Sequence, residues 1–124
     1  MNSQFTNIVR LALGIMLVVF GSNMIHDFIH LPPPSGKAGD FMASLGATGY
    51  IFQTVGLLEV VVGLMLLLKK WVAFGLLLLA PISVNILLFH LFLDIPGLGI
   101  AIAVAFLNGI LIYKHWRQYK PIFT

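Results

Sequence analysis

The sequence predicts an all-α fold, an integral membrane four-helix bundle with both termini in the cytoplasm. Apolar residues make up 60% of the 124 residues and charged residues only 9%, whereas soluble domains contain about 25% charged residues. A single domain this short cannot bury so much apolar surface, because small domains have a high ratio of surface to volume. The composition therefore excludes a water-soluble globule and indicates that lipid surrounds the chain.

Charge and cysteine content exclude further classes of protein. The formal net charge is +3, and the basic residues gather at two places in the sequence instead of forming a basic face, so nucleic acid is not an expected partner. The chain contains no cysteine, which excludes disulfides, thiol redox chemistry, iron–sulfur clusters and thiolate metal sites.

Stretches with few charges predict the membrane spans. Segments 71–89 and 95–113 carry no charge, and each approaches the roughly 20 residues that a helix needs to cross a bilayer. Two further stretches each contain one charge, Glu59 or Arg10. Helices are preferred to barrel strands because the apolar runs are continuous. We predict one membrane domain over residues 1–124, with spans at about 5–25, 49–68, 71–92 and 96–114 and an outer loop at 31–48.

The distribution of basic residues predicts the orientation. With both termini in the cytoplasm, Lys37 is the one basic residue outside. The basic residues that then lie inside are Arg10, Lys69, Lys70, Lys114, Arg117 and Lys120. Such an excess follows the positive-inside rule, and Trp71, Tyr113, Trp116 and Tyr119 then lie at the inner interface, where aromatic rings are favoured. We expect a multi-pass protein of the inner (cytoplasmic) membrane.

The connections between the spans differ in length. Lys69 and Lys70 form a turn between antiparallel helices, and Asp94 is placed to cap the last span. The outer loop is longer, and the prolines at 32–34 stop any helix that precedes them. After them, Phe41 and its neighbours Met42 and Leu45 can form one amphipathic turn at the outer surface, which makes this loop a candidate lid.

Small residues predict which helix faces pack, since close backbone approach drives helix association in lipid. They recur at Gly14 and Gly21 in the first span, at Gly49, Gly56 and Gly63 in the second, and at Gly97, Ala101 and Ala105 in the fourth. At 100° per residue, Glu59 projects from the same face as Gly56 and Gly63, with Gln53 on that stripe, and Asn108 shares the face of Ala101. The polar groups are therefore expected to point into the bundle.

Glu59 is the most informative of these residues. A carboxyl at the bilayer centre costs about 2.5 to 3.5 kcal/mol on insertion scales, so such residues usually have a function or a partner. Glu59 either carries a proton or binds a cofactor, or it fixes helix packing, neutral or hydrogen-bonded to Arg10, Gln53 or Asn108. The candidate intramembrane polar site comprises Glu59, Asn85, His90, Arg10, Gln53 and Asn108.

Histidines offer two further possibilities. His90 can act as a proton relay or metal ligand near the outer interface, or form a hydrogen bond with Asp94 or a loop carbonyl. His26 and His30 have the spacing of two imidazoles on one metal, with Asp27 nearby, but a solvated helix end is the preferred explanation. No third strong ligand is identifiable, and the chain lacks a haem attachment motif, so we predict no resident metal.

Three segments together resemble the DoxX family of small four-helix membrane proteins. They are Arg10-Leu-Ala-Leu-Gly14, the run Gly56-Leu-Leu-Glu59-Val-Val-Val-Gly63-Leu-Met-Leu-Leu-Leu, and Pro81-x-x-x-Asn85 followed by His90. The resemblance implies an inner-membrane bundle related to the small subunits of archaeal quinone-linked thiosulfate oxidoreductase and to methylamine-utilisation membrane proteins. The fold is also similar to that of quinone-linked thiol oxidoreductases, which need a cysteine pair that this chain lacks.

Three functions remain open at this point. The first is a small membrane subunit of a quinone-linked redox system, with quinone or another hydrophobic ligand in the bundle beside Glu59. The second is a proton-coupled small transporter working as an oligomer, with Glu59 alternating between a proton and a cation. The third is a non-catalytic assembly partner of other membrane subunits.

Overall fold

The structure is a computed structural model that describes residues 4–26 and 34–123, and within these ranges it is helical without a strand. The elements are α1 (Gln4–His26), α2 (Gly36–Ala47), α3 (Ile51–Leu68), α4 (Val72–Phe92), η1 (Ile95–Gly97), α5 (Leu98–Lys114), α6 (Trp116–Tyr119) and η2 (Lys120–Phe123). The prediction of an all-α fold is confirmed.

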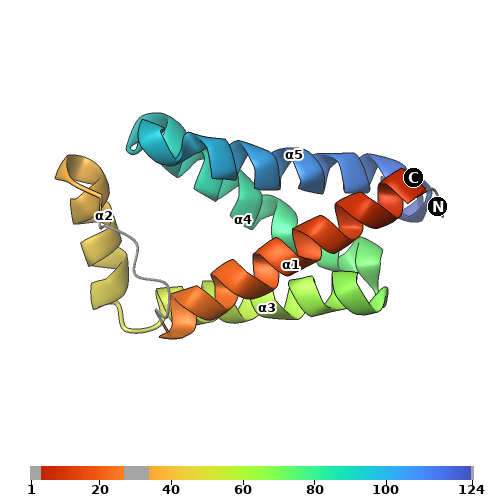
Figure 1. Ribbon diagram of the computed structural model, residues 1–124, viewed down its shortest axis with the longest axis horizontal. Helices are drawn as coiled ribbons and strands as arrows, with labels where there is room; N and C mark the ends of the chain where they lie inside the picture. Colours follow the sequence, from red (N-terminus) through yellow and green to blue (C-terminus); the bar gives the residue numbers. More distant parts are fainter. Residues whose placement is uncertain (1–3, 27–33, 124) are drawn as a thin grey trace.

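Four helical segments are long and apolar enough to cross a membrane, which agrees with the predicted bundle. They are Gln4–His26, Ile51–Leu68, Val72–Phe92 and Ile95–Lys114, and their ends lie within two residues of the predicted spans. Helix α1 lies along α3, and α4 lies along α5 (Figure 1). The two ends of the described chain lie at the same end of the bundle.

Two glycine pairs set the contact between α1 and α3. A Cβ atom built on Gly56 would lie 2.7 Å from the carbonyl oxygen of Gly21, and a Cβ on Gly21 would lie 2.7 Å from that of Gly56. Gly14 and Gly63 form the second pair. A Cβ on Gly14 would lie 3.1 Å from the Gly63 carbonyl oxygen, and a Cβ on Gly63 would lie 2.9 Å from that of Gly14. Only residues without a side chain allow this approach, so the predicted packing face of these two helices is confirmed.

Leucines fill the core between the helices toward the end where the chain termini lie. The fully buried side chains are Leu13 and Leu17 of α1, Val62 and Leu66 of α3, Leu76 and Leu79 of α4, and Leu111 of α5. They come from all four long helices, which shows that the helices share one core. The other large apolar side chains of these helices are mostly exposed or half-buried, as expected for helices that face lipid.

The outer loop contains a longer helix than the single turn that the sequence predicts. Helix α2 runs for 12 residues across the end of the bundle opposite the termini (Figure 1). Ala38 is its buried residue, and the Phe41 ring lies 5.6 Å from that of Phe89 on α4. The single-turn expectation is wrong because the sequence after the prolines contains no further helix breaker stronger than glycine.

Helix α3 begins two residues later than predicted. The Thr48 hydroxyl donates to the Leu45 carbonyl at 2.6 Å and accepts from the Ile51 amide at 3.2 Å. Gly49 adopts a φ of +80° in this turn. The expectation that Gly49 belongs to the packing stripe is therefore wrong, because the residue lies in the turn before the helix.

Candidate functional site in the bundle interior

Glu59 lies on the buried face of α3, with its side chain 4% exposed. Val62 and Leu66 follow it at i+3 and i+7 and are completely buried. A Cβ atom on Gly21 would lie 2.9 Å from the Glu59 Cβ, so α1 covers the base of this side chain. The Oε2 atom is buried and has no hydrogen-bond partner in the described part of the chain. Glu59 therefore places an unpaired carboxyl oxygen inside the bundle, as its shared face with Gly56 predicts.

Ser83 is a second buried polar residue and is not among the predicted site residues. It is 2% exposed, and its Oγ atom also has no hydrogen-bond partner among the described residues. Ser83 continues the buried face of α4 formed by Leu76 and Leu79, at i+7 and i+4 from them. That spacing was the available signal, because a serine in line with core leucines must be buried with them.

The register of the helices brings Glu59 and Ser83 to similar depths. A Cβ on Gly75 of α4 would lie 3.1 Å from the Met65 sulfur and 3.5 Å from a methyl group of Val62. Since α3 and α4 are antiparallel, the same register places Ser83 within about one turn of Glu59. Side chains lean toward the N-terminus of their own helix. In antiparallel helices these directions are opposite, so the lean of Glu59 and Ser83 reduces the difference in depth between them.

Arg10 has a different role from the expected one as a partner of Glu59. Its guanidinium Nη1 donates to the Leu66 carbonyl oxygen in the last turn of α3. Carbonyls at a helix C-terminus lack partners within the helix, and a cation there also interacts favourably with the helix dipole. Leu66 is two turns from Glu59, roughly 10 Å along the helix. The structure thus explains Arg10 as a buried cation that caps α3.

The three candidate amides separate into different positions. Asn108 is 3% exposed and donates from Nδ2 to the Leu76 carbonyl at 3.2 Å, which ties α5 to α4. Gln53 and Asn85 are exposed, so the expectation that they line the interior is wrong. Gln53 lies roughly 120° around the helix from Glu59, at 100° per residue. Asn85 donates to the Pro81 carbonyl at 2.8 Å on its own helix.

His90 lies in the last turn of α4 and faces the turn that leads to η1. Its Nδ1 atom lies 3.0 Å from the Asp94 carbonyl oxygen and 3.3 Å from the Asp94 carboxylate. A Cβ on Gly97 would lie 2.5 Å from the imidazole ring, so the turn closes over it. The interpretation of His90 as a partner of Asp94 is confirmed. The expected cap by Asp94 is wrong, since its side chain forms no cap hydrogen bond and faces His90 instead.

The remaining histidine pair is described only in part. His26 is exposed at the end of α1, whereas Asp27 and His30 lie outside the described residues. Over residues 4–26 and 34–123 there is no group of three or more histidine, aspartate or glutamate side chains able to hold a metal ion.

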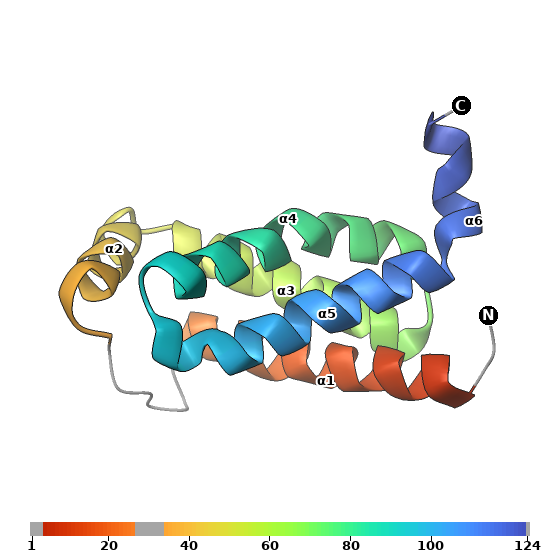
Figure 2. The same ribbon diagram turned by 90° about the horizontal axis from the view of Figure 1, so that it is seen from above.

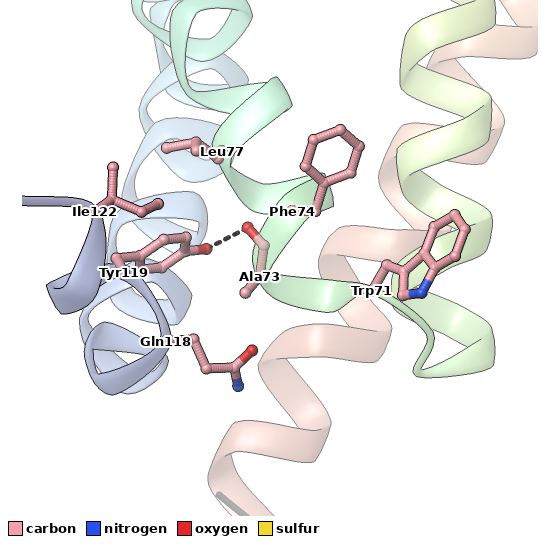
Figure 3. A pocket seen from close by; sticks show the side chains of 7 residues that line it. All are labelled: Trp71, Ala73, Phe74, Leu77, Gln118, Tyr119 and Ile122. Carbon is pink, nitrogen blue, oxygen red and sulfur yellow. Dashed lines mark hydrogen bonds between the residues drawn. The ribbon is translucent and has the colours of Figure 1, made fainter.

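A groove lies at the other end of the bundle, where α6 and η2 turn away from the helix axes (Figure 2). Its walls are Trp71 just before α4, Ala73, Phe74 and Leu77 of α4, and Gln118, Tyr119 and Ile122 of the C-terminal segment (Figure 3). The hydroxyl of Tyr119, a residue only 3% exposed, donates to the Ala73 carbonyl. Trp116 stacks on Phe123 with ring centroids 5.9 Å apart. The Tyr119 hydrogen bond holds the C-terminal segment against the start of α4, and the ring stacking is internal to that segment.

Tyr119 should give this segment a distinct response to alkaline pH. Desolvation by burial raises the pKa of Tyr119 from 10.0 to about 12. Because the pKa of Tyr119 is higher in the folded state, the protonated side chain contributes its full stabilisation of the fold below pH 10.0. This contribution is lost as pH rises through about 12. Spectrophotometric titration should show a tyrosine ionising near pH 12 that is absent from Tyr119→Phe. The variant should lose about 1 kcal/mol from the missing hydrogen bond. If Tyr119→Phe and the wild type gave the same titration curve, the assignment of the high-pH ionisation to Tyr119 would be wrong.

The positions that combine deep burial with an unpaired side-chain oxygen are thus Glu59 and Ser83 within the described part of the chain. Arg10, Asn108 and His90 are used in contacts between or within helices. Comparison with known proteins adds no relative from which a function can be read: no family model, curated protein or solved structure matches this chain.

Proposed function

We propose that this chain is a DoxX-like small membrane subunit of a quinone-linked redox system, in which Glu59 takes up and releases a proton. The observation that carries the proposal is the Glu59 carboxyl, 4% exposed and with Oε2 lacking a partner in the described residues. A carboxyl committed to packing is expected to form hydrogen bonds, because an unpaired buried polar atom is costly. Glu59 instead keeps an oxygen available for a proton.

The placement of Glu59 favours proton transfer over the binding of a bulky ligand at the same site. Two shallow hollows on the described structure are lined by other residues, toward the end of the bundle where the chain termini lie. Quinone reduction consumes protons as well as electrons, so a subunit that carries protons through the membrane suits such a system. In this proposal, partner subunits supply the electrons and Glu59 supplies a proton site.

The test is Glu59→Gln, which keeps the shape of the side chain and removes its ability to ionise. Quinone-dependent turnover should fall by at least about tenfold, since a positioned proton-transfer group typically contributes 10²- to 10⁴-fold. Thermal unfolding in detergent should stay unchanged. The matched control is Gln53→Glu, which places a carboxyl on the exposed side of the same helix and should leave turnover at the wild-type level.

Two results would contradict the proposal in different ways. A fully active Glu59→Gln would remove the proton role and leave a packing role. A redox system that works equally well without the chain would remove the assignment to such a system and favour a non-catalytic assembly partner.

A proton-coupled small transporter is the second candidate, and the same unpaired carboxyl supports it. In that case Glu59 exchanges its proton for a lipophilic cation. Addition of such a cation to detergent-solubilised protein would then release protons from the wild type and release none from Glu59→Gln. The quinone-linked proposal predicts no proton release from either protein.

A further inference from the structure

The groove beside α6 has an apolar end and a polar end. In Figure 3 the side-chain amide of Gln118 and the indole nitrogen of Trp71 lie on one side, and Leu77 lies on the opposite side, further along α4. Leu77 is deeper in the membrane span, whereas Trp71 stands at its end. The polarity of the groove therefore changes along the direction in which a bilayer changes from hydrocarbon to headgroups.

The charged side chains beside the groove in the described part of the chain are basic. Arg117 and Lys120 are exposed basic residues that stand next in sequence to the groove-lining Gln118 and Tyr119. Residues 1–26, 60–93 and 95–124 contain no acidic residue, and these ranges supply the described segments that meet at this end. Among the described residues no aspartate or glutamate side chain lies at this end, so the charges of Arg117 and Lys120 are available to an anion outside the chain.

We infer that this groove binds an anionic phospholipid, with an acyl chain along Phe74 and Leu77 and the headgroup near Gln118, Arg117 and Lys120. A lipid meets both requirements of the site, because it pairs an apolar chain with a negative group at the depth where the groove changes polarity. Phosphate oxygens accept hydrogen bonds from amide, indole and guanidinium donors. Tyr119, bonded to the Ala73 carbonyl, fixes the distance between the two walls.

The two tryptophans of the chain, Trp71 and Trp116, both lie at this end, so their fluorescence reports on the groove. We would study the full chain with Trp116→Phe, which retains a ring to stack on Phe123, and leave Trp71 as the probe. Vesicles of phosphatidylcholine would contain a minor, fixed fraction of brominated phosphatidylglycerol or of brominated phosphatidylcholine. The expected result is at least about twofold stronger quenching of Trp71 by the anionic lipid, decreasing as salt screens the charges.

Matched variants test the origin of the preference. Arg117→Gln combined with Lys120→Gln should make quenching by the two lipids equal, whereas Lys37→Gln, at the opposite end on α2, should leave the preference intact. Equal quenching in the parent protein would overturn the proposal, as would a preference that survives the double variant. Protection of Trp71 from both lipids would show that a second copy or another protein covers the groove, and would also overturn it.

Native mass spectrometry of the wild-type chain gives a second readout that does not depend on the tryptophan variant. After incubation with equal amounts of the two phospholipids, the chain should retain phosphatidylglycerol in preference to phosphatidylcholine. The double variant should retain both lipids equally. Equal retention by the wild type would contradict the inference even if the fluorescent variant failed to fold.

Discussion

Gly56→Ala should lower the thermal stability of the bundle in detergent by more than any alanine substitution on its lipid-facing surface. The new methyl group would lie 2.7 Å from the Gly21 carbonyl oxygen, a backbone atom that cannot move without separating α1 from α3. Overpacking of this kind costs about 1–3 kcal/mol. Gly21→Ala should have a similar effect, because its methyl group would meet the Gly56 carbonyl oxygen at the same separation.

Gly109→Ala is the matched control for both variants. Gly109 lies in α5, and nothing is found within 4 Å of a Cβ built on it. Alanine is favoured over glycine in a helix by about 1 kcal/mol, so this variant should unfold at a higher temperature than the wild type. The same glycine-to-alanine change is therefore expected to lower the unfolding temperature at Gly56 and to raise it at Gly109. If Gly56→Ala and Gly109→Ala shifted the unfolding temperature alike, the close α1–α3 contact would be wrong.

Cysteine labelling should give an all-or-none answer on orientation, which is inferred from the basic residues. Ser35 and Ser44 are exposed at the α2 end of the bundle, and Lys70 is exposed at the other end. The natural chain lacks cysteine, so single substitutions need no background removal. In intact cells an impermeant thiol reagent should label Ser35→Cys and Ser44→Cys and leave Lys70→Cys unlabelled.

Permeabilised cells supply the control for that experiment, because all three cysteines should then react. Labelling of Lys70→Cys in intact cells, with Ser35→Cys and Ser44→Cys protected, would reverse the proposed topology. The bundle itself would be unaffected by such a result, since its antiparallel packing is independent of which end faces the cytoplasm.

The fold was predictable because the bilayer imposes a simple rule on sequence. The positions of rare charges such as Lys69 and Lys70 indicate where spans end, and glycines seven residues apart indicate which faces meet. Glu59 was placed correctly for the same reason, since it shares the face of Gly56 and Gly63. Helix α2 was underestimated because its three glycines, Gly36, Gly39 and Gly46, lower the helix propensity on which sequence reasoning depends.

The partners of polar side chains were harder to predict. Arg10 and Glu59 are both buried, but the Arg10 guanidinium reaches a backbone carbonyl that no sequence pattern marks as a partner. Asn108 likewise bonds to the Leu76 carbonyl. Backbone carbonyls occur at every position, so only the helix register decides which one is reached. Gln53 was wrongly predicted to face the interior, whereas it is exposed in the first turn of α3.

The most extensive contact between two elements, that of α1 with α3, joins segments that are separated in the chain by α2 and its flanking residues. Chain connectivity therefore contributes little to the pairing beyond a loop-closure entropy that changes slowly with loop length. The glycine contacts, rather than the covalent link, hold the first helix in register. A longer connection between the two helices should therefore weaken their pairing only slightly.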